Sequence, residues 1–395
     1  YGIDFVTLTF AMFKAGLVPV LIDPGLGKKN VLKCIKQVQP HGMIAVPLAH
    51  AIKKFFPSTF KSIQHNVTVG SRWFWGGTTL NKLHDSGKAD FKMAVMEKNH
   101  PAAILFTSGS TGPAKGVLFS HDIFNHQVRI LQEQFNITPD ETDLPTFPLF
   151  GLFSIGLGIT SIIPEMDATK PARVDPKNII DPIQNYKISS SFGSPALWDT
   201  VTQYCLSQNI QLPSLKRIIM AGAPVSGDLL ARFENIIDKN CKIYTPYGAT
   251  EVLPVSLIDR REILDETWSL SNQGKGTCVG YPIPGVEIKI IEITDQPILS
   301  WQDVNKLGAN IVGEIVVKAE WMTRTYYNRQ DLTQLAKIED GNSFWHRMGD
   351  LGRLDEKNRL WFYGRKNQRV VTELETLYTV PCEAIFNQHP DVKRS

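Results

Sequence analysis

The chain is poor in cysteine, and its cysteines form no metal-binding or disulfide pattern. The 395 residues include five cysteines, which are scattered, odd in number and never spaced as a Cys-x-x-Cys pair. This usage argues against a disulfide framework and a zinc site, and it favours reduced thiols in the cytoplasm. The nine histidines lack ligand spacing as well, so the sequence predicts no site built from histidine and cysteine.

An excess of charge of either sign is also absent. The net charge is +3 for 395 residues, which argues against the concentrated basic surface that nucleic acids require. With 43% hydrophobic and 21% charged residues, the composition is that of a globular protein long enough for more than one domain.

The sequence offers no unbroken membrane-spanning segment. Residues 144–163 carry no charge and are about long enough to cross a bilayer. However, two prolines and three glycines interrupt this stretch, and Pro164 follows it directly. Because these residues break a spanning helix, we expect a bent, buried segment that lines a pocket.

The most informative segment that is present is Thr107–Gly116, TSGSTGPAKG, which follows an apolar run at 102–106. Glycine lets backbone N–H groups approach an oxyanion, hydroxyl groups donate hydrogen bonds, and lysine adds positive charge. The segment is not a Walker loop, because Ala114 precedes Lys115 and Gly116 follows it. It predicts a phosphate-binding loop of another kind, with candidate ligands Thr107, Ser108, Gly109, Ser110, Thr111, Gly112, Lys115 and Gly116.

The order of the apolar runs predicts an α/β fold. Short strands alternate with helical runs before and after the loop, which is typical of parallel strands. They are expected at 18–22, 42–46, 67–69, 189–192, 216–220 and 242–244. From residue 276 to 364 the sequence is β-rich and turn-rich, which predicts a small β-barrel-like subdomain.

The same reading predicts the domain organisation. We expect one large domain over 1–364, whose N-terminal part is missing because the chain opens within a helical pattern, and whose β-barrel-like subdomain spans 276–364. The segment GRKNQR at 364–369 is typical of a linker. Residues 365–395 are therefore expected to be a hinge and the truncated start of a further domain.

Three more segments carry chemistry. Tyr244–Glu251, YTPYGATE, places an aromatic ring, a hydroxyl and a carboxylate close together. Met220–Pro224, MAGAP, is a turn of small residues after a strand, and His346–Asp355, HRMGDLGRLD, is followed closely by Gly364 and Arg365. Each segment is weak by itself, but their order and separations are specific.

Together with the loop, these segments resemble the adenylate-forming superfamily of acyl-CoA synthetases, peptide-synthetase adenylation domains and luciferases. The resemblance covers essentially the whole chain. It implies an α/β fold with two stacked, mainly parallel αβ layers, a small β-barrel and the start of a mobile α+β C-terminal domain. It also implies ATP and Mg²⁺ as cofactors.

The resemblance assigns the phosphate and metal contacts. Residues 107–116 are expected to hold the β- and γ-phosphates, with Lys115 supplying charge. Thr250 is expected to contact the α-phosphate, and Glu251 to ligate Mg²⁺. Lys115, Thr250 and Glu251 are thus the expected catalytic residues. The family also uses a lysine late in its C-terminal domain, and no residue of this chain matches that position.

The nucleoside contacts follow in the same way. Asp350 is expected to bind the ribose hydroxyls, since one carboxylate can accept from both, and Arg365 is expected to reach the ribose or a phosphate. The adenine is expected to lie between backbone and ring contacts from Ala221, Gly222, Ala223, Tyr247, Gly248 and Ala249.

The acyl pocket is expected from the segments 147–153 and 191–198. Neither contains an ionic group, and the ammonium of an amino acid would need a carboxylate partner. A long aliphatic acid fits better. The expected lining residues are Phe150, Gly151, Phe153, Phe192, Gly193 and Trp198.

One region departs from the thioester-forming members of the superfamily. Asn367 stands at the hinge position where they carry aspartate, and residues 370–386 contain no glycine, so the usual path for CoA is in doubt. This pattern, with FKAGLVPVLIDPG and PCEAIFNQHP, resembles the β-lactone synthetases of bacterial long-chain olefin biosynthesis. The resemblance implies that a 2-alkyl-3-hydroxy fatty acid is adenylated and then closed to a β-lactone, within a pathway that supplies further partner enzymes.

Two alternatives stay open at this point. One is a long-chain fatty-acid–CoA ligase, which the same motifs would serve. The other is a protein that binds an acyl group or a nucleotide without turnover.

Overall fold

The computed structural model describes residues 2–87, 91–107, 114–392 and 395. Contacts between residues divide the chain into two compact units. The larger unit comprises 1–8, 122–324 and 331–395, and the smaller unit comprises 9–121 and 325–330. The domain boundary expected at residue 364 stays a prediction.

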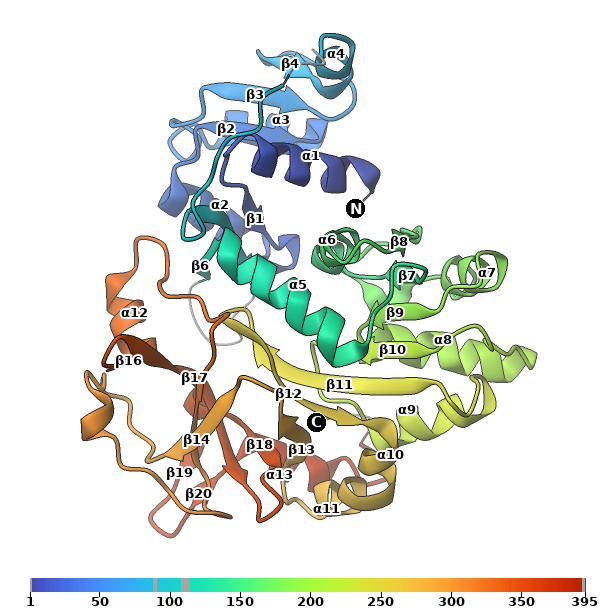
Figure 1. Cartoon of the computed structure of the whole chain (residues 1–395), viewed down its shortest axis with the longest axis vertical. Coiled ribbons are helices and arrows are strands. Elements are labelled where there is room, and N and C mark those ends of the chain that lie inside the picture. The colour runs from blue at the N-terminus through green and yellow to red at the C-terminus, as the bar shows by residue number, and fades with distance from the viewer. Residues whose placement is uncertain (1, 88–90, 108–113, 393–394) are drawn as a thin grey trace. The chain divides into compact units, whose positions relative to one another are not determined.

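The smaller unit is built on two three-stranded sheets (Figure 1). In the first, β5 (Pro101–Thr107) lies between the parallel strand β1 (Val20–Ile22) and the antiparallel strand β6 (Lys115–Ser120). In the second, three strands run parallel: β2 (Gly42–Ala45), β3 (His65–Thr68) and β4 (Thr78–Thr79). The helices are α1 (Ile3–Lys14, which begins in the larger unit), α2 (Lys28–Val38), α3 (Pro47–Phe55) and α4 (Leu80–Asp85).

The larger unit is organised by a 12-stranded sheet in which β7 to β11 run parallel. Neighbouring strands on this path follow the order β14-β15-β17-β18-β13-β12-β11-β10-β9-β7-β8, with β16 beside β17. The parallel strands are β7 (Thr142–Pro145), β8 (Thr160–Ser161), β9 (Ser190–Gly193), β10 (Arg217–Met220) and β11 (Lys242–Ala249). The strands expected at 189–192, 216–220 and 242–244 are thereby confirmed.

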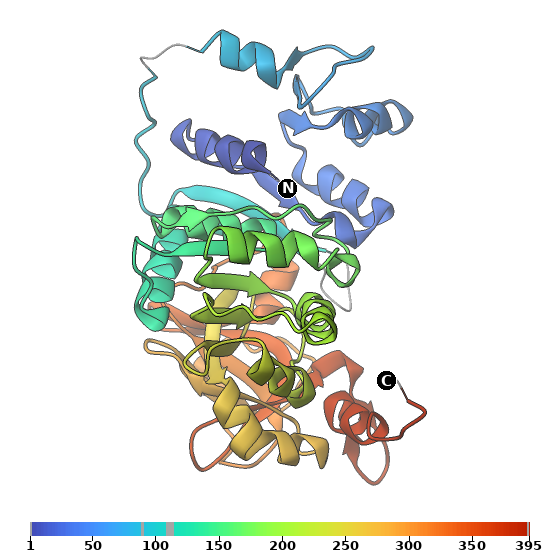
Figure 2. The ribbon, with the colours of Figure 1, turned by 90° about the vertical axis from the view of Figure 1, so that its right-hand side faces the viewer.

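Helices cover the parallel half of this sheet (Figure 2). One of them, α8, begins with the Ser194 hydroxyl accepting from the Leu197 N–H and ends at Asn209 in the left-handed region, as N-caps and C-caps require. Its Trp198 packs against Phe233 in the main hydrophobic core. The helices along this half are α5 (His121–Phe135), α6 (Pro148–Gly156), α7 (Lys177–Asn185), α8 (Pro195–Gln208) and α9 (Gly227–Arg232).

The antiparallel half continues the same sheet through the β-rich region. Its strands are β12 (Val252–Asp259), β13 (Thr277–Pro282), β14 (Glu287–Ile291), β15 (Gly313–Lys318), β16 (Lys337–Asp340), β17 (Ser343–Leu354) and β18 (Leu360–Arg365). Alternate side chains such as Ile288, Ile315 and Val317 form a second core, because successive residues of a strand face opposite sides. The short elements are α10 (Arg260–Glu262), α11 (Trp268–Asn272), α12 (Gln330–Ala336), β19 (Val370–Val371), β20 (Thr376–Leu377) and α13 (Thr379–Phe386).

A buried charge network ties the residue after β18 to this half. Glu314, which is fully buried, accepts from Arg347 at 2.7 and 3.1 Å and from the Lys366 ammonium at 3.0 Å. Arg347 also donates to the Gln296 carbonyl at 2.7 Å. Two cations thus depend on one carboxylate that water does not reach.

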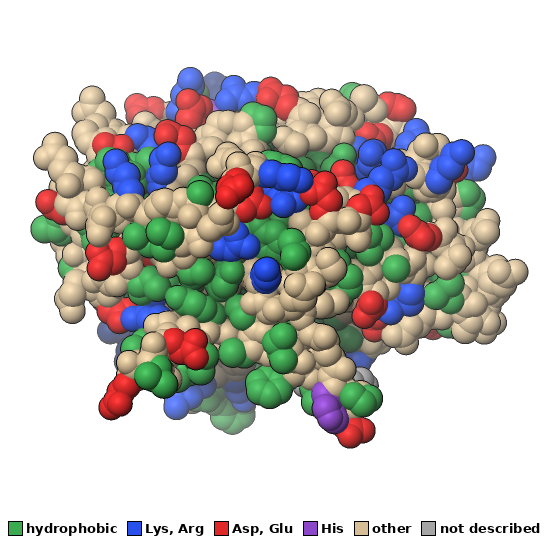
Figure 3. Space-filling model, turned by 90° about the horizontal axis from the view of Figure 1, so that it is seen from below, with side chains coloured by type: hydrophobic (Ala, Val, Ile, Leu, Met, Phe, Trp, Pro, Cys, Tyr) green, Lys and Arg blue, Asp and Glu red, His purple; other side chains and the backbone are tan. Residues whose placement is uncertain are grey.

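Positive and negative side chains are mixed on the face of the molecule that Figure 3 draws. Figure 3 shows Lys and Arg side chains interspersed with Asp and Glu on the face it presents, in keeping with the small net charge. Within the residues that the structure describes, no helix is long and apolar enough to cross a membrane.

The network around Glu314 predicts a large stability effect. We expect Glu314→Gln to lower the free energy of unfolding by about 3–5 kcal/mol, because it leaves the buried Arg347 and the half-buried Lys366 without their carboxylate partner. The midpoint of urea unfolding, followed by tryptophan fluorescence, measures this. The matched control is Asp167→Asn, which removes an exposed pair with Lys170 and is expected to leave the midpoint unchanged. Equal shifts in the two variants would contradict the prediction.

Candidate functional site

The expected phosphate loop connects two paired strands of the smaller unit. Thr107 at the end of β5 and Lys115 at the start of β6 are cross-strand partners. The ammonium of Lys115 lies 5.1 Å from the centre of the Tyr326 ring. Residues 108–113 lie outside the described part of the chain, so the expected roles of Ser108, Gly109, Ser110, Thr111 and Gly112 stay predictions.

The expected Thr250 and Glu251 lie in the tight connection between β11 and β12. Ala249 pairs with Val252 across this turn, and the register shifts between Tyr247 and Ala249. A side chain at Gly248 would come within 2.8 Å of the Val252 carbonyl, so only glycine fits there. The backbone carbonyl of Glu251 accepts from the Thr323 N–H at 2.9 Å, which holds the turn in place.

Asp350 is the centre of a hydrogen-bonded triad with Tyr247 and Arg365. Its carboxylate accepts from the Tyr247 hydroxyl at 2.6 Å and from the Arg365 guanidinium at 2.7 Å. Asp350 on β17 and Arg365 on β18 are cross-strand partners, and Tyr247 comes from β11. The structure therefore brings together three residues that are separated by up to 118 positions in the sequence (365 − 247 = 118).

Burial decides the electrostatics of this triad. It raises the pKa of Asp350, while Arg365 and the Tyr247 hydroxyl act in the opposite direction. The pKa of Tyr247 lies well above its usual range because of burial and the neighbouring Asp350 charge. Tyr247 therefore stays a hydrogen-bond donor, and the carboxylate keeps lone pairs for further donors, such as the hydroxyls of a ribose.

The turn after β10 contains the small residues expected beside an adenine. The Ala221 N–H points to the Gly193 carbonyl at 3.4 Å. Gly222 has φ +93°, a conformation that glycine adopts without strain. Ala223 completes this turn. Ala221 also lines the cavity described below, so this turn and the cavity share a wall.

Lys337 lies beside Glu251, and sequence analysis missed it. Burial lowers its pKa to about 7, with the nearby Glu251 opposing this and Arg324 adding to it. Its ammonium donates to the Thr323 carbonyl and lies 4.9 Å from the Phe344 ring centre. The residue lies 86 positions from Glu251 (337 − 251 = 86), and no local signal separates it from surface lysines.

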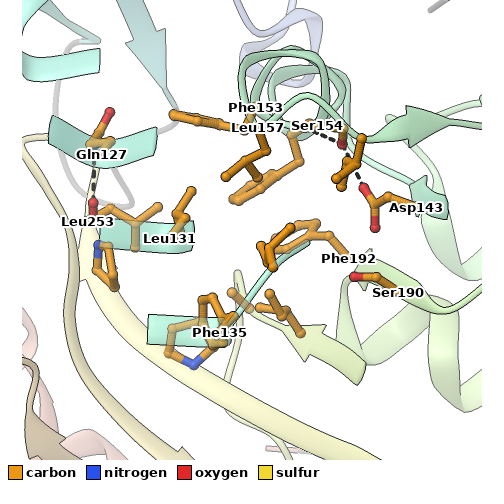
Figure 4. A pocket seen from close by; sticks show the side chains of 17 residues that line it. Gln127, Leu131, Phe135, Asp143, Phe153, Ser154, Leu157, Ser190, Phe192 and Leu253 are labelled. Carbon is orange, nitrogen blue, oxygen red and sulfur yellow. Dashed lines mark hydrogen bonds between the residues drawn. The ribbon is translucent and has the colours of Figure 1, made fainter. Parts of the chain in front are cut away.

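An apolar cavity lies between α5, α6 and the parallel strands (Figure 4). It holds about 740 Å³ of space, part of which is open to solvent. The rings of Phe150 and Phe192 stack with their centres 3.4 Å apart at its wall. The cavity is also lined by Phe153, Leu131, Phe135, Leu157, Ile159, Ile219, Leu253 and Pro254. The segment 144–163 supplies several of these residues, as its composition predicts.

Other expected acyl-pocket residues lie elsewhere in the same layer. Trp198 is fully buried in the main core, and a side chain at Gly193 would meet its indole nitrogen at 2.6 Å. Gly151 is buried on α6. Among the described residues these three do not line the cavity, and their roles in acyl binding stay predictions.

Asp143 introduces a carboxyl group into this apolar cavity. It is 7% exposed and accepts from the Ser154 hydroxyl at 2.6 Å. Burial raises its pKa to about 6, while hydrogen bonds from Ser154 and Ser190 and the charge of Arg217 act in the opposite direction. The sequence gives no sign of this role, because Asp143 follows Asp140 and Glu141 in an acidic stretch that is typical of an exposed loop.

A metal site built by the protein alone is not apparent. No group of three or more His, Cys, Asp or Glu among the described residues could hold a metal ion. A single carboxylate such as Glu251 fits Mg²⁺ that arrives with nucleotide phosphates, because Mg²⁺ is commonly held by one or two carboxylates and the substrate.

Comparison with known proteins identifies relatives over the whole chain. The sequence profile described as AMP-binding enzyme matches residues 2–327. The chain is 43% identical to an olefin beta-lactone synthetase of Xanthomonas campestris, over 99% of this chain and 70% of that protein. It is 42% identical to the olefin beta-lactone synthetase of Stenotrophomonas maltophilia, over 99% and 71%. A long-chain-fatty-acid–CoA ligase of Thermus thermophilus is 24% identical over 98% and 69%.

Solved structures support the fold. The O-succinylbenzoate coenzyme A synthetase of Bacillus subtilis, in complex with ATP and magnesium, matches with a TM-score of 0.77 and 20% identity, over 100% of this chain and 74% of that one. The long-chain-fatty-acid–CoA ligase of Archaeoglobus fulgidus matches with a TM-score of 0.74 and 21% identity, over 100% and 74%. These findings confirm the resemblance and the fold class expected from the sequence.

The buried Asp143 predicts a pH-dependent stability. Its carboxyl binds a proton more tightly in the folded chain than in the unfolded chain, so the stability that this proton contributes is lost as pH rises from about 4 to about 6. Asp143→Asn has no such proton to lose. We therefore expect the unfolding free energy of this variant to rise relative to the wild type across that window and to stay level above about pH 7.

Urea unfolding at a series of pH values measures this difference. The control is Asp181→Asn, which replaces an exposed carboxylate of α7. A difference between Asp143→Asn and the wild type that stays flat with pH would show that the carboxyl is not buried as described.

Proposed function

Since the chain belongs to the AMP-binding enzyme family, we propose that it adenylates a long-chain 2-alkyl-3-hydroxy fatty acid and closes it to a β-lactone. It is an AMP-forming ligase, and its relatives of 42–43% identity are olefin beta-lactone synthetases over 99% of the chain. The observation that carries the proposal within the structure is the apolar cavity that shares Ala221 with the adenine turn.

We assign the nucleotide contacts as follows. The segment 107–116 with Lys115 holds the β- and γ-phosphates of ATP. Tyr247 and the small residues around it, Ala221, Gly222, Ala223, Gly248 and Ala249, hold the adenine. Asp350 accepts from the ribose hydroxyls, with Arg365 close to it. Thr250 contacts the α-phosphate, and Glu251 holds Mg²⁺, which would offset the negative charge of the phosphates.

The first step joins the acid to AMP. A carboxylate oxygen attacks the α-phosphorus, and the bond from that phosphorus to pyrophosphate breaks. Both reactants are anionic, so cations such as Lys115 lower the repulsion and stabilise charge on the departing pyrophosphate. Asp350 and Tyr247 hold the nucleoside in place. Part of the entropy cost of bringing the reactants together is therefore met when ATP binds and not during the chemical step.

The second step closes the ring. The 3-hydroxyl oxygen attacks the acyl carbon, the bond from that carbon to AMP breaks, and the hydroxyl proton passes to water. The nucleophile is already attached to the acyl group, so a high effective concentration replaces a second substrate such as CoA. The apolar cavity excludes water from the alkyl chain.

A long-chain fatty-acid–CoA ligase is the second candidate. The 24% identical relative from Thermus thermophilus favours it. The segment 370–386, which lacks glycine, favours the lactone, because the family's usual path for CoA uses a glycine there.

Product analysis separates the two functions. We expect the protein to convert ATP and a 2-alkyl-3-hydroxy fatty acid to AMP, pyrophosphate and a β-lactone at the same rate with and without CoA. Mass spectrometry of the lipid extract measures the product. A thioester product with strict dependence on CoA would reject the lactone and leave acid activation intact.

The assignment of the phosphate and metal contacts is tested by exchange of pyrophosphate into ATP. We expect Glu251→Gln and Lys115→Ala each to lower the exchange rate by about 100-fold or more, the loss seen when one group that stabilises transition-state charge is removed. Glu356→Gln, an exposed substitution, serves as the control. Unaffected exchange in both site variants would overturn the assignment.

A further inference from the structure

One buried polar atom of a residue that lines the cavity has no hydrogen-bond partner among the described residues. Gln127 on α5 is 4% exposed, and its side-chain N–H donates to the Leu253 carbonyl at 3.1 Å. Its side-chain carbonyl oxygen is buried and accepts no hydrogen bond. Leaving such an acceptor unpaired costs about 1–3 kcal/mol of folding free energy. A bound ligand that donates a hydrogen bond to this oxygen would remove that cost.

The orientation of this amide is fixed by its neighbour. Rotating it by half a turn would place the Gln127 carbonyl against the Leu253 carbonyl, and two acceptors repel each other. The unpaired group is therefore the Gln127 carbonyl oxygen, which is an acceptor. A ligand group that pairs with it must be a hydrogen-bond donor. An aliphatic chain carries no donor, whereas a hydroxyl does.

Gln127 lies near the turn that contains Glu251, where we expect the carboxyl group of the acid to react. Gln127, Leu131 and Phe135 line the cavity from one face of α5 (Figure 4). Leu253, which holds the Gln127 amide, is the second residue after Glu251. The unpaired acceptor thus lies close to the turn assigned to the phosphates and Mg²⁺.

Asp143 cannot take this role. It pairs with Ser190 across β7 and β9, three strand positions before Gly193, whose carbonyl is close to the Ala221 N–H. Three strand steps correspond to about 10 Å. Asp143 therefore lies away from the turn after β10, opposite α5 in Figure 4, and it already accepts from Ser154.

We propose that Gln127 accepts a hydrogen bond from the 3-hydroxyl of the acid and is a specificity-determining residue for hydroxy acids. The inference rests on the proposed function and names the substrate group that the cavity recognises. Gln127 takes no proton, since an amide is not a base at neutral pH. It orients the hydroxyl oxygen toward the acyl carbon, and the proton leaves to water during closure as described above.

The test compares two acids that differ in one oxygen. A 2-alkyl-3-hydroxy fatty acid and its 3-deoxy counterpart are assayed by pyrophosphate exchange with the wild type and with Gln127→Met, which keeps the length of the side chain and removes the acceptor. A hydrogen bond to a neutral partner, with the penalty for leaving it unmade, corresponds to about 10-fold or more in kcat/KM. We expect the wild type to prefer the hydroxy acid by that factor and the variant to lose the preference.

Leu131→Ala is the matched control. It enlarges the same cavity from the next turn of the same helix without changing polarity, so the ratio between the two acids is expected to stay that of the wild type. A second measurement needs no variant: the hydroxy acid is expected to raise the melting temperature of the wild-type protein more than the deoxy acid at equal concentration.

The possible outcomes distinguish failure of the role of Gln127 from failure of the proposed function. Equal kcat/KM for the two acids in the wild type, or an unchanged ratio in Gln127→Met, would overturn the role of Gln127 and leave acid activation standing. Equal melting shifts with the two acids would also count against it. Absence of exchange with both acids in the wild type would overturn the proposed function itself.

Discussion

The hydrogen-bonded carboxylate of Asp350 is the interaction on which the arrangement of the site depends. It joins strands β11, β17 and β18, which belong to the parallel and the antiparallel halves of one sheet. A carboxylate at 3% exposure is stable only with strong donors, and Tyr247 and Arg365 provide them. Because Arg365 ends β18, the same pair fixes the point at which the chain leaves the large sheet.

Two further buried ion pairs repeat this principle in the larger unit. Arg217 pairs with Glu141 at the edge of the parallel strands, and Arg347 with Glu314 in the antiparallel half. Each is held by additional hydrogen bonds, such as that from Arg217 to the Phe135 carbonyl at 2.9 Å. Such pairs need precise geometry to offset the loss of hydration, so they specify how the strands and helices meet.

The apolar cavity shows the opposite balance. Aromatic and aliphatic side chains form most of its wall, and polar atoms are confined to a few positions. Asp143 is satisfied by neighbouring hydroxyls, whereas the Gln127 carbonyl has no donor within the described part of the chain. Such a lining suits the alkyl chain of the substrate that we propose, and a few polar groups suffice to select among ligands in pockets of this kind.

Several elements could be predicted from the sequence because their signals are local. Strand β10 was expected at 216–220 and is found at Arg217–Met220, since a short run rich in β-branched residues favours a strand whatever its neighbours. The residues 144–163 were expected to line a pocket on the same kind of local ground, and Phe150 and Phe153 do so. The loop at 107–116 and the motifs around Ala221, Tyr247 and Asp350 identified the family through their residues, order and separations.

Other features depended on partners that are distant along the chain. Lys337, Gln127 and Asp143 became recognisable only when folding placed them beside Glu251, Leu253 and Ser154. The composition of a segment determines whether it forms a helix or a strand and which face is apolar. Burial, strand register and the loss of a hydrogen-bond partner arise only from the tertiary structure, because they are properties of two segments in contact and not of either one.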